Sequence, residues 1–438
     1  MQLLAFVFSY LGSFYAAFVY HRAFAFVGYL MVYFFYPFGG FRWWSYSLPS
    51  IPYSFTTTAL MISVYLMNFS ESNKNKILAC PQMVCAWVLA LYYFFVNIFA
   101  IRPDLHMMFS VLFLKTMITV TVAYKLIDKD KMLNIVLFAY IFGAAFVGLL
   151  VKQVGRNSGP NWDRVAGVDL VDNPDTNGVA AVIAPAAICA LYWFWIDSRL
   201  KMRVPMIIAG ALVVNAVVLI NSRGSFLGVI GGSSYFIFNL YFSKFRRKGQ
   251  RLGVMILIAL GLVAVFNVVD QSTIERFYTI SEEAEVDEEQ EGGGTRMFFW
   301  VAAYEMSKDY PFGMGKLGFN KFADEYLPQD LNTGGNRARS IHSTWFQTLN
   351  EAGYPGLILF ILMHFFCFRT LSACQRVAVE NNDIPNYYKC VAIKSMFVSY
   401  MIASTFLDLM TANFGYWLVL FSACVYNLHV LKEKRPDR

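Results

Sequence analysis

The chain has 438 residues, of which 57% are hydrophobic and only 15% are charged, and its mean hydropathy is +0.47. A water-soluble protein could not bury that much apolar surface, so the composition excludes a soluble globular protein. Apolar runs of about 20 residues recur along the chain, and a hydrocarbon core of about 30 Å requires helices of that length. The sequence therefore predicts an all-α, polytopic transmembrane helical bundle.

The apolar runs predict about 12–13 spans. Their residue ranges are 3–20, 23–38, 52–69, 82–101, 105–124, 133–151, 177–196, 204–221, 224–242, 252–268, 344–367, 390–408 and 412–430. The first run lacks a basic N-region and a cleavage site, so we expect a retained span rather than a signal peptide. We divide the chain into N-terminal transmembrane helices (1–151), central transmembrane helices with an outer loop at 152–176 (152–268), a large periplasmic loop with short helices (269–343) and C-terminal transmembrane helices (344–438).

Lysine and arginine gather in alternate loops, and this asymmetry predicts the orientation. More than half of the 36 basic residues lie in these loops: Arg22, Lys74, Lys76, Lys125, Lys129, Lys131, Arg199, Lys201, Arg203, Lys244, Arg246, Arg247, Lys248, Arg251, Arg369, Arg376, Lys389, Lys432, Lys434, Arg435 and Arg438. We expect them on the cytoplasmic side, with the N-terminus outside and the C-terminus inside. The same bias accounts for the formal charge of +7, so no nucleic-acid partner is indicated.

The seven cysteines all fall in predicted spans or on the basic side, so the large outer loops contain no candidate disulfide. The sequence has no CxxC pair and no Cys/His cluster, which argues against a zinc site. It also contains no Walker-type glycine loop, no GxSxG elbow and no convincing DxD-like outer motif. We therefore expect chemistry that needs neither a metal ion nor another cofactor.

The two long outer loops differ in character. The loop at 152–176 is rich in Gly, Pro, Asn and Asp, which favour turns. In the longer loop, 271–280 is predicted as a short helix and the acidic run 282–291 as a solvated, mobile segment. A second helix is predicted from Arg296 to Tyr310, where apolar residues recur at helical spacing until Pro311.

Arg223 lies at the outer end of a span, where it either marks the membrane interface or binds an anion. The glycines at 224, 228, 231 and 232 favour close helix packing, although they could equally leave a groove for a lipid chain. Arg296 opens a helix, and its planar guanidinium either pairs with the acidic run or binds phosphate oxygens. Arg164 and Arg276 are weaker candidates of the same kind.

His342 begins the stretch that leads into the next span. Imidazole is the usual general base near neutral pH, but a single histidine at an interface can be structural. Glu351 is expected where that helix meets the membrane, holding a helix end or an arginine. Lys115 in mid-span and Asp408 near a span end are expected to face the protein interior, as a structural pair or with Lys115 near a substrate charge.

These pieces, in this order, resemble the O-antigen ligase/polymerase superfamily of bacterial polytopic membrane glycosyltransferases. The matching residues are Ser222-Arg223-Gly224, Glu275-Arg276-Phe277 with Thr279, Thr295-Arg296 with Trp300, Pro311 with Gly313-Met314-Gly315, and His342 with Glu351-Ala352-Gly353. They cover about 220–360, the family's C-terminal catalytic region. Residues 164–167 with Asp172-Asn173 and Asn177 resemble the exosortase-associated branch of O-glycosylation ligases. The acidic run 282–291 and a thirteenth span depart from the family pattern.

The resemblance implies a glycan donor linked to undecaprenyl diphosphate and an acceptor hydroxyl on lipid A core, another glycan or a protein. It also implies that Arg223 and Arg296 bind the diphosphate and that His342 activates the acceptor, on the periplasmic face of the inner membrane. The expected role is polysaccharide biosynthesis for the cell envelope. Ligase and repeat-unit polymerase are not distinguished by the sequence. A glycolipid transporter or flippase, or a structural partner of an assembly complex, are the alternatives from other classes.

Overall fold

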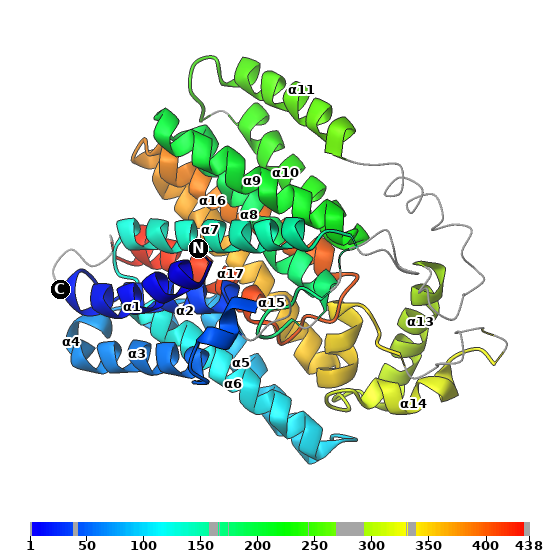
Figure 1. Cartoon of the computed structure of the whole chain (residues 1–438). Coiled ribbons are helices and arrows are strands. Elements are labelled where there is room, and N and C mark those ends of the chain that lie inside the picture. The colour runs from blue at the N-terminus through cyan, green and yellow to red at the C-terminus, as the bar shows by residue number, and fades with distance from the viewer. Residues whose placement is uncertain are drawn as a thin grey trace.

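The computed structural model describes residues 2–37, 43–156, 165, 167–173, 175–243, 245–268, 293–329, 331 and 339–432. Helices dominate these residues, as predicted, and an isolated bridge joins Leu170 to Asn173 (Figure 1). The helices are α1 (Gln2–Val19), α2 (Phe24–Phe34), α3 (Tyr53–Met67), α4 (Phe69–Ser72), α5 (Pro81–Phe95), α6 (Pro103–Leu126), α7 (Asp130–Val154), α8 (Thr176–Ile196), α9 (Leu200–Ile220), α10 (Arg223–Phe242), α11 (Gln250–Val268), α13 (Gly293–Asp309), α14 (Gly318–Tyr326), α15 (Thr344–Glu380), α16 (Ile384–Ser404) and α17 (Asn413–Tyr426).

Every predicted span coincides with one of these helices. Within the described part of the chain, nine helical segments are long and apolar enough to cross a membrane, whereas α2, α3 and the apolar part of α11 are shorter. The predictions of full spans at 23–38 and 52–69 are therefore wrong in their length, and α16, at the predicted span 390–408, is not among the nine. Helix α2 ends at Phe34, shortly before Pro37, and a residue that precedes proline disfavours helical backbone.

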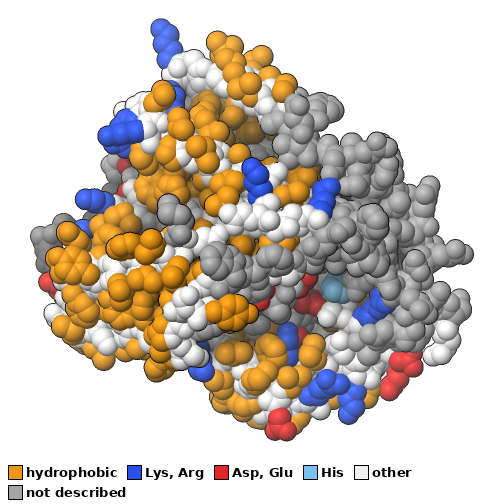
Figure 2. Space-filling view, viewed as in Figure 1, with side chains coloured by type: hydrophobic (Ala, Val, Ile, Leu, Met, Phe, Trp, Pro, Cys, Tyr) orange, Lys and Arg blue, Asp and Glu red, His pale blue; other side chains and the backbone are white. Residues whose placement is uncertain are grey.

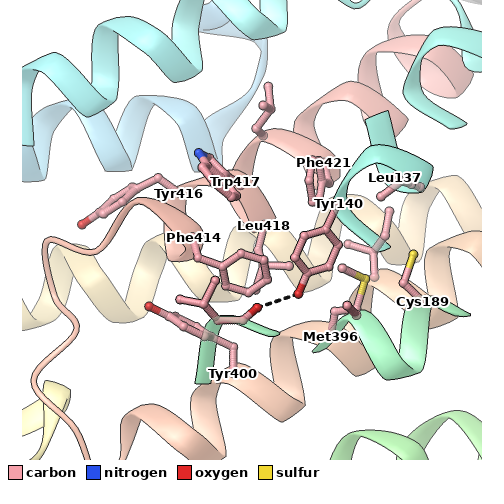
Figure 3. Close-up of a cluster of buried hydrophobic side chains, with 14 of the residues drawn as sticks. Leu137, Tyr140, Cys189, Met396, Tyr400, Phe414, Tyr416, Trp417, Leu418 and Phe421 are labelled. Atoms are coloured by element: carbon pink, nitrogen blue, oxygen red, sulfur yellow. Dashed lines mark hydrogen bonds between the residues drawn. The ribbon is translucent and has the colours of Figure 1, made fainter. Parts of the chain in front are cut away.

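The core of the bundle is built around α8 and α17, whose side chains are mostly buried. Figure 3 shows the aromatic centre of this core, to which α7, α16 and α17 contribute. The Tyr140 ring stacks on Phe414 with 5.0 Å between centroids, and its hydroxyl donates to the Val182 carbonyl over 2.7 Å. Trp417 packs edge-on against Tyr33 at 4.7 Å. These contacts make the inner helices a close-packed platform for the outer loops.

The end of the first outer loop packs into the bundle rather than over it. Val168 and Leu170 are buried in the main core cluster. Asp172 accepts hydrogen bonds from the Tyr33 hydroxyl at 2.5 Å and from the Asn413 backbone N–H at 2.7 Å. The chain turns back at Asn173, and α8 begins at Thr176. This loop therefore ties α2, α8 and α17 together at one level of the bundle.

Helices α13 and α14 form a small outer layer beside one end of the bundle (Figure 1). Their apolar faces share a separate core that includes Phe299, Met306 and Phe319. The prediction of a helix at 296–310 is confirmed, because α13 ends at Asp309 ahead of Pro311. The predicted helix at 271–280 and the acidic run 282–291 lie outside the described residues.

Two glycines fasten this outer layer to α15, which bends at Gly353. Gly353 has φ +66° and ψ −171°, a conformation open essentially to glycine alone, and a Cβ there would lie 2.3 Å from the Pro311 carbonyl oxygen. A Cβ on Gly313 would lie 2.6 Å from the Glu351 carbonyl oxygen. The two backbones approach this closely because the backbone N–H of Tyr354 donates a hydrogen bond to the Pro311 carbonyl oxygen at 2.9 Å. The segment after α13 is thus held directly against the bend in α15.

Candidate functional site

His342 stands immediately before α15, in a left-handed backbone conformation with φ +54°. Its neighbour Ser343 donates a backbone hydrogen bond to Oδ1 of Asp408 at 3.1 Å. Both His342 and Asp408 are half-buried, so both are reachable from solvent. Burial raises the pKa of Asp408, while the nearby His342 and Lys316 side chains lower it and offset part of that rise. An imidazole and a carboxylate are therefore electrostatically coupled at the end of α15.

A buried ion pair lies beside them. Nζ of Lys316 is 3.1 Å from Oε1 of Glu351, and the two side chains are only 11% and 6% exposed. Glu351 also accepts hydrogen bonds from the Tyr93 hydroxyl at 2.7 Å and from Nε2 of Gln347 at 3.0 Å. The Lys316 ammonium lies 5.0 Å from the centre of the Phe109 ring, in cation–π range. Each oxygen of the carboxylate therefore has a donor, as a buried charge requires.

His106 fixes the loop that carries this lysine. Its Nδ1 accepts the backbone N–H of Lys316 at 2.9 Å, so the ring proton belongs on Nε2, which is 2.8 Å from the Tyr93 carbonyl oxygen. The ring is buried in the first turns of α6. These bonds hold Lys316 beside the end of α5 and the start of α6, which makes His106 a positioning residue.

The elements that carry Arg223, Arg296 and His342 meet around two aromatic side chains. On α13, Trp300 lies one turn after Arg296, and its indole N–H donates to the Ile341 carbonyl at 3.1 Å, next to His342. The ring centroids of Trp300 and Phe406 are 6.1 Å apart. Phe406 in turn packs against Gly224 at the start of α10, where a Cβ would lie 3.0 Å from the Phe406 ring. The structure thus brings the starts of α10, α13 and α15 to one place.

The family model for O-antigen ligase matches residues 208–361. Over these residues the chain is similar to the O-antigen ligase family. The matched region runs from α9 into α15, so it contains Arg223, Arg296, His342 and the Lys316–Glu351 ion pair. A search of curated proteins found no match to the chain.

The match confirms the resemblance to the O-antigen ligase/polymerase superfamily over nearly the same residues that the motifs indicated. It indicates an O-antigen ligase- or polymerase-type activity for a multi-pass membrane protein. The placement in the exosortase-associated branch stays a prediction. Arg164 and Arg276 lie outside the described residues, so their assignment as supporting residues also stays a prediction.

The glycines of the O-antigen ligase region settle one open alternative. A Cβ on Gly228 would lie 2.6 Å from the Ser399 carbonyl oxygen, and one on Gly232 would lie 2.7 Å from that of Ser395. Both carbonyls belong to α16. The glycine stripe therefore allows α10 and α16 to pack closely, and that space is not left for a lipid chain.

Three expectations about charged residues need correction. Lys115 does not face the interior, because its side chain is exposed while the adjacent Thr116 and Met117 on α6 are buried. Asp408 does not lie in a span, since α16 ends at Ser404 and α17 begins at Asn413. Glu351 holds a lysine rather than an arginine.

Sequence reasoning missed Lys316 and His106. Lys316 follows Gly315 in an outer loop and looks like any solvated lysine, and only the tertiary contact with α15 buries it. In the described ranges, no three His, Cys, Asp or Glu side chains are grouped as metal ligands would be. Metal independence stays a prediction.

Proposed function

We propose that this protein is a membrane glycosyltransferase of the O-antigen ligase type. It transfers a glycan from undecaprenyl diphosphate to an acceptor hydroxyl on lipid A core, another glycan or a protein, at the periplasmic face of the inner membrane. The observation that carries the proposal lies within the region matched to O-antigen ligase. There, a partly accessible histidine, His342, lies where the two arginine-bearing helices converge, and it interacts electrostatically with Asp408 from the segment that follows α16.

In this reaction His342 is the general base. The acceptor oxygen attacks the anomeric carbon, its proton passes to the imidazole, and the bond from that carbon to the diphosphate oxygen breaks with inversion. A positioned base of this kind contributes roughly 10²–10⁴-fold to the rate. Asp408 stabilises the imidazolium that forms, because its carboxylate already interacts electrostatically with His342.

The arginines neutralise the leaving group. Negative charge grows on the diphosphate as the glycosidic bond breaks, and a guanidinium presents a planar pair of donors to phosphate oxygens. Arg223 opens α10, where the helix N-terminus adds partial positive charge. Arg296 lies in the first turns of α13. The diphosphate is itself a good leaving group, so charge stabilisation and base catalysis meet the main demands of the reaction.

The test is glycan transfer by membranes that contain Arg223→Ala, Arg296→Ala or His342→Ala protein. Each variant is expected to accumulate normally and to lose transfer, whereas Arg102→Ala, an exposed arginine at the start of α6, serves as the matched control. Normal glycan products from all three site variants would refute the proposal. The intermediate that accumulates on lipid identifies the acceptor: long chains indicate a ligase, and single repeat units indicate a polymerase.

A further inference from the structure

A second candidate site lies far along the chain from His342, where α8 ends, α9 begins and α10 connects to α11. A groove of about 350 Å³ opens there, within the range of roughly 300–1,000 Å³ that small-molecule sites occupy. Its basic lining comes from Arg203, Arg247 and Lys248, and its aromatic lining from Phe194 and Trp195. These residues belong to the side of the bundle on which lysine and arginine are concentrated.

The elements around this groove contain basic residues and almost no acidic ones. The sequence has no Asp or Glu from residue 198 to residue 269. Asp197, just before that stretch, already pairs with Arg199 at 2.6 Å. Figure 2 shows Lys and Arg side chains at the upper left, near the helix ends of this part of the bundle. The Asp197 carboxylate also interacts electrostatically with Arg203, so an anion would compete with one acidic side chain against several cations.

Two of the guanidiniums are held in place by uncharged acceptors. Nε of Arg203 donates to the Asp197 backbone carbonyl at 2.6 Å, and its guanidinium packs over the Phe194 ring at 5.6 Å. Both Nη atoms of Arg247 lie 3.4 Å from the Ile196 carbonyl oxygen. Backbone carbonyls and rings orient a cation without cancelling its charge. The groove is thus ordered and still cationic.

The opposite wall of the groove is apolar and belongs to α11. This helix lies at the edge of the bundle (Figure 1), and Ile256 and Leu260, which line the groove, are 53% and 63% exposed. Gly253 on the same helix leaves room beside the Trp195 ring, which a Cβ would approach to 3.1 Å. A ligand that fills this groove therefore needs a negatively charged head and a long apolar part.

We propose that the groove binds one anionic phospholipid from the leaflet on the basic side of the membrane. Arg203, Arg247 and Lys248 hold the phosphate, and an acyl chain lies along the exposed face of α11. Basic pockets between membrane helices on the cytoplasmic side are suited to such headgroups. The site is independent of the glycan-transfer centre, and its failure would leave that assignment untouched.

The test compares lipid binding by the purified full-length chain in neutral detergent, measured by native mass spectrometry. Phosphatidylglycerol is the probe, phosphatidylcholine is the zwitterionic comparison, and glycerol 3-phosphate is the headgroup without acyl chains. We expect one phosphatidylglycerol to be retained in preference to phosphatidylcholine. Each basic residue near a lipid headgroup contributes a few-fold in affinity, so Arg203→Gln/Arg247→Gln/Lys248→Gln protein should bind roughly 10-fold to 100-fold more weakly.

Two controls separate a built site from general attraction between charges. The Lys74→Gln/Lys129→Gln/Lys131→Gln variant removes the same charge from exposed lysines elsewhere on the basic side and should bind normally. Gly253→Leu narrows the groove beside Trp195 without changing the charge and should abolish retention of phosphatidylglycerol. Equal losses in the two triple variants, or equal retention of the two phospholipids, would overturn the proposal. Binding of glycerol 3-phosphate as tight as that of phosphatidylglycerol would overturn the role of α11.

Discussion

Breaking the buried ion pair of Lys316 and Glu351 should destabilise the outer layer more than the loss of a surface salt bridge would. The two side chains are 11% and 6% exposed, so neither charge is screened by water when its partner is removed. Surface pairs contribute about 0–1 kcal/mol, whereas removal of one partner from a buried pair costs about 3–5 kcal/mol. The exposure of this pair places it in the second class.

The two single substitutions should differ in how much stability they remove. In Lys316→Met protein, Glu351 retains its hydrogen bonds from the Tyr93 hydroxyl and from Gln347. In Glu351→Gln protein, the Lys316 ammonium keeps a cation–π contact with Phe109 and its electrostatic interaction with Asp408 but loses the carboxylate that pairs with it at 3.1 Å. We therefore expect Glu351→Gln to lower the free energy of unfolding by about 5 kcal/mol and Lys316→Met to lower it by about 3 kcal/mol.

The assay is a double-mutant cycle on the purified protein in lipid nanodiscs. The free energy of unfolding is compared for wild type, the two single variants and Lys316→Met/Glu351→Gln. The double variant should recover most of the stability, because no uncompensated charge remains in it. Additive losses, or single losses below about 1 kcal/mol, would refute the interpretation that the pair is buried and coupled.

Three further predictions concern the same region. Asp408→Asn should lower transfer about tenfold or more without loss of stability at neutral pH. Burial raises the folded pKa of this carboxyl, so its contribution to stability is present below about 3.8 and is lost as pH rises through the raised value. The melting temperature of the variant should therefore depend less on pH than that of wild type. Gly353→Ala should cost at least about 1–3 kcal/mol through backbone strain alone, with the unobstructed Gly12→Ala as the control in thermal melts. Trp300→Phe removes the hydrogen bond to the Ile341 carbonyl and should cost only about 0.5–1.5 kcal/mol in stability while reducing transfer more strongly, since that bond positions His342.

The helices were predictable from the sequence because their apolar periodicity and length reflect local requirements. Helix α13 is an example: apolar residues recur at helical spacing from Arg296, and Pro311 closes the segment. The placement of Arg223 at the start of α10 was predictable for the same reason. Residue types at helix ends therefore indicated where these helices begin and end.

The contacts between those ends were not predictable in this way. Lys316 pairs with Glu351 across 35 residues of sequence, and His106 reaches the backbone of Lys316 across 210 residues. No periodic pattern marks such a contact, since a lysine in an outer loop has the same local sequence whether it is buried or solvated. Lys115 illustrates the opposite error, because one step around α6 decides whether a side chain faces the core or the outside.

The geometry also explains why a rigid support is needed at the start of α15. A general base must lie within hydrogen-bond reach of the acceptor hydroxyl, and a shift of about 1 Å can cost 10²-fold in rate. His342 occupies a left-handed conformation, which an L-residue adopts only when its surroundings impose it. Those surroundings are the hydrogen bonds from Trp300 to Ile341 and from Ser343 to Asp408. The first bond holds Ile341, the residue before the histidine, and the second holds Ser343, the residue after it. The first partner, Trp300, lies on the helix that carries Arg296, so a motion of that helix would reach both Arg296 and the residue before His342. In the proposed mechanism, binding of the diphosphate by Arg296 and activation of the acceptor by His342 would thus be linked through α13.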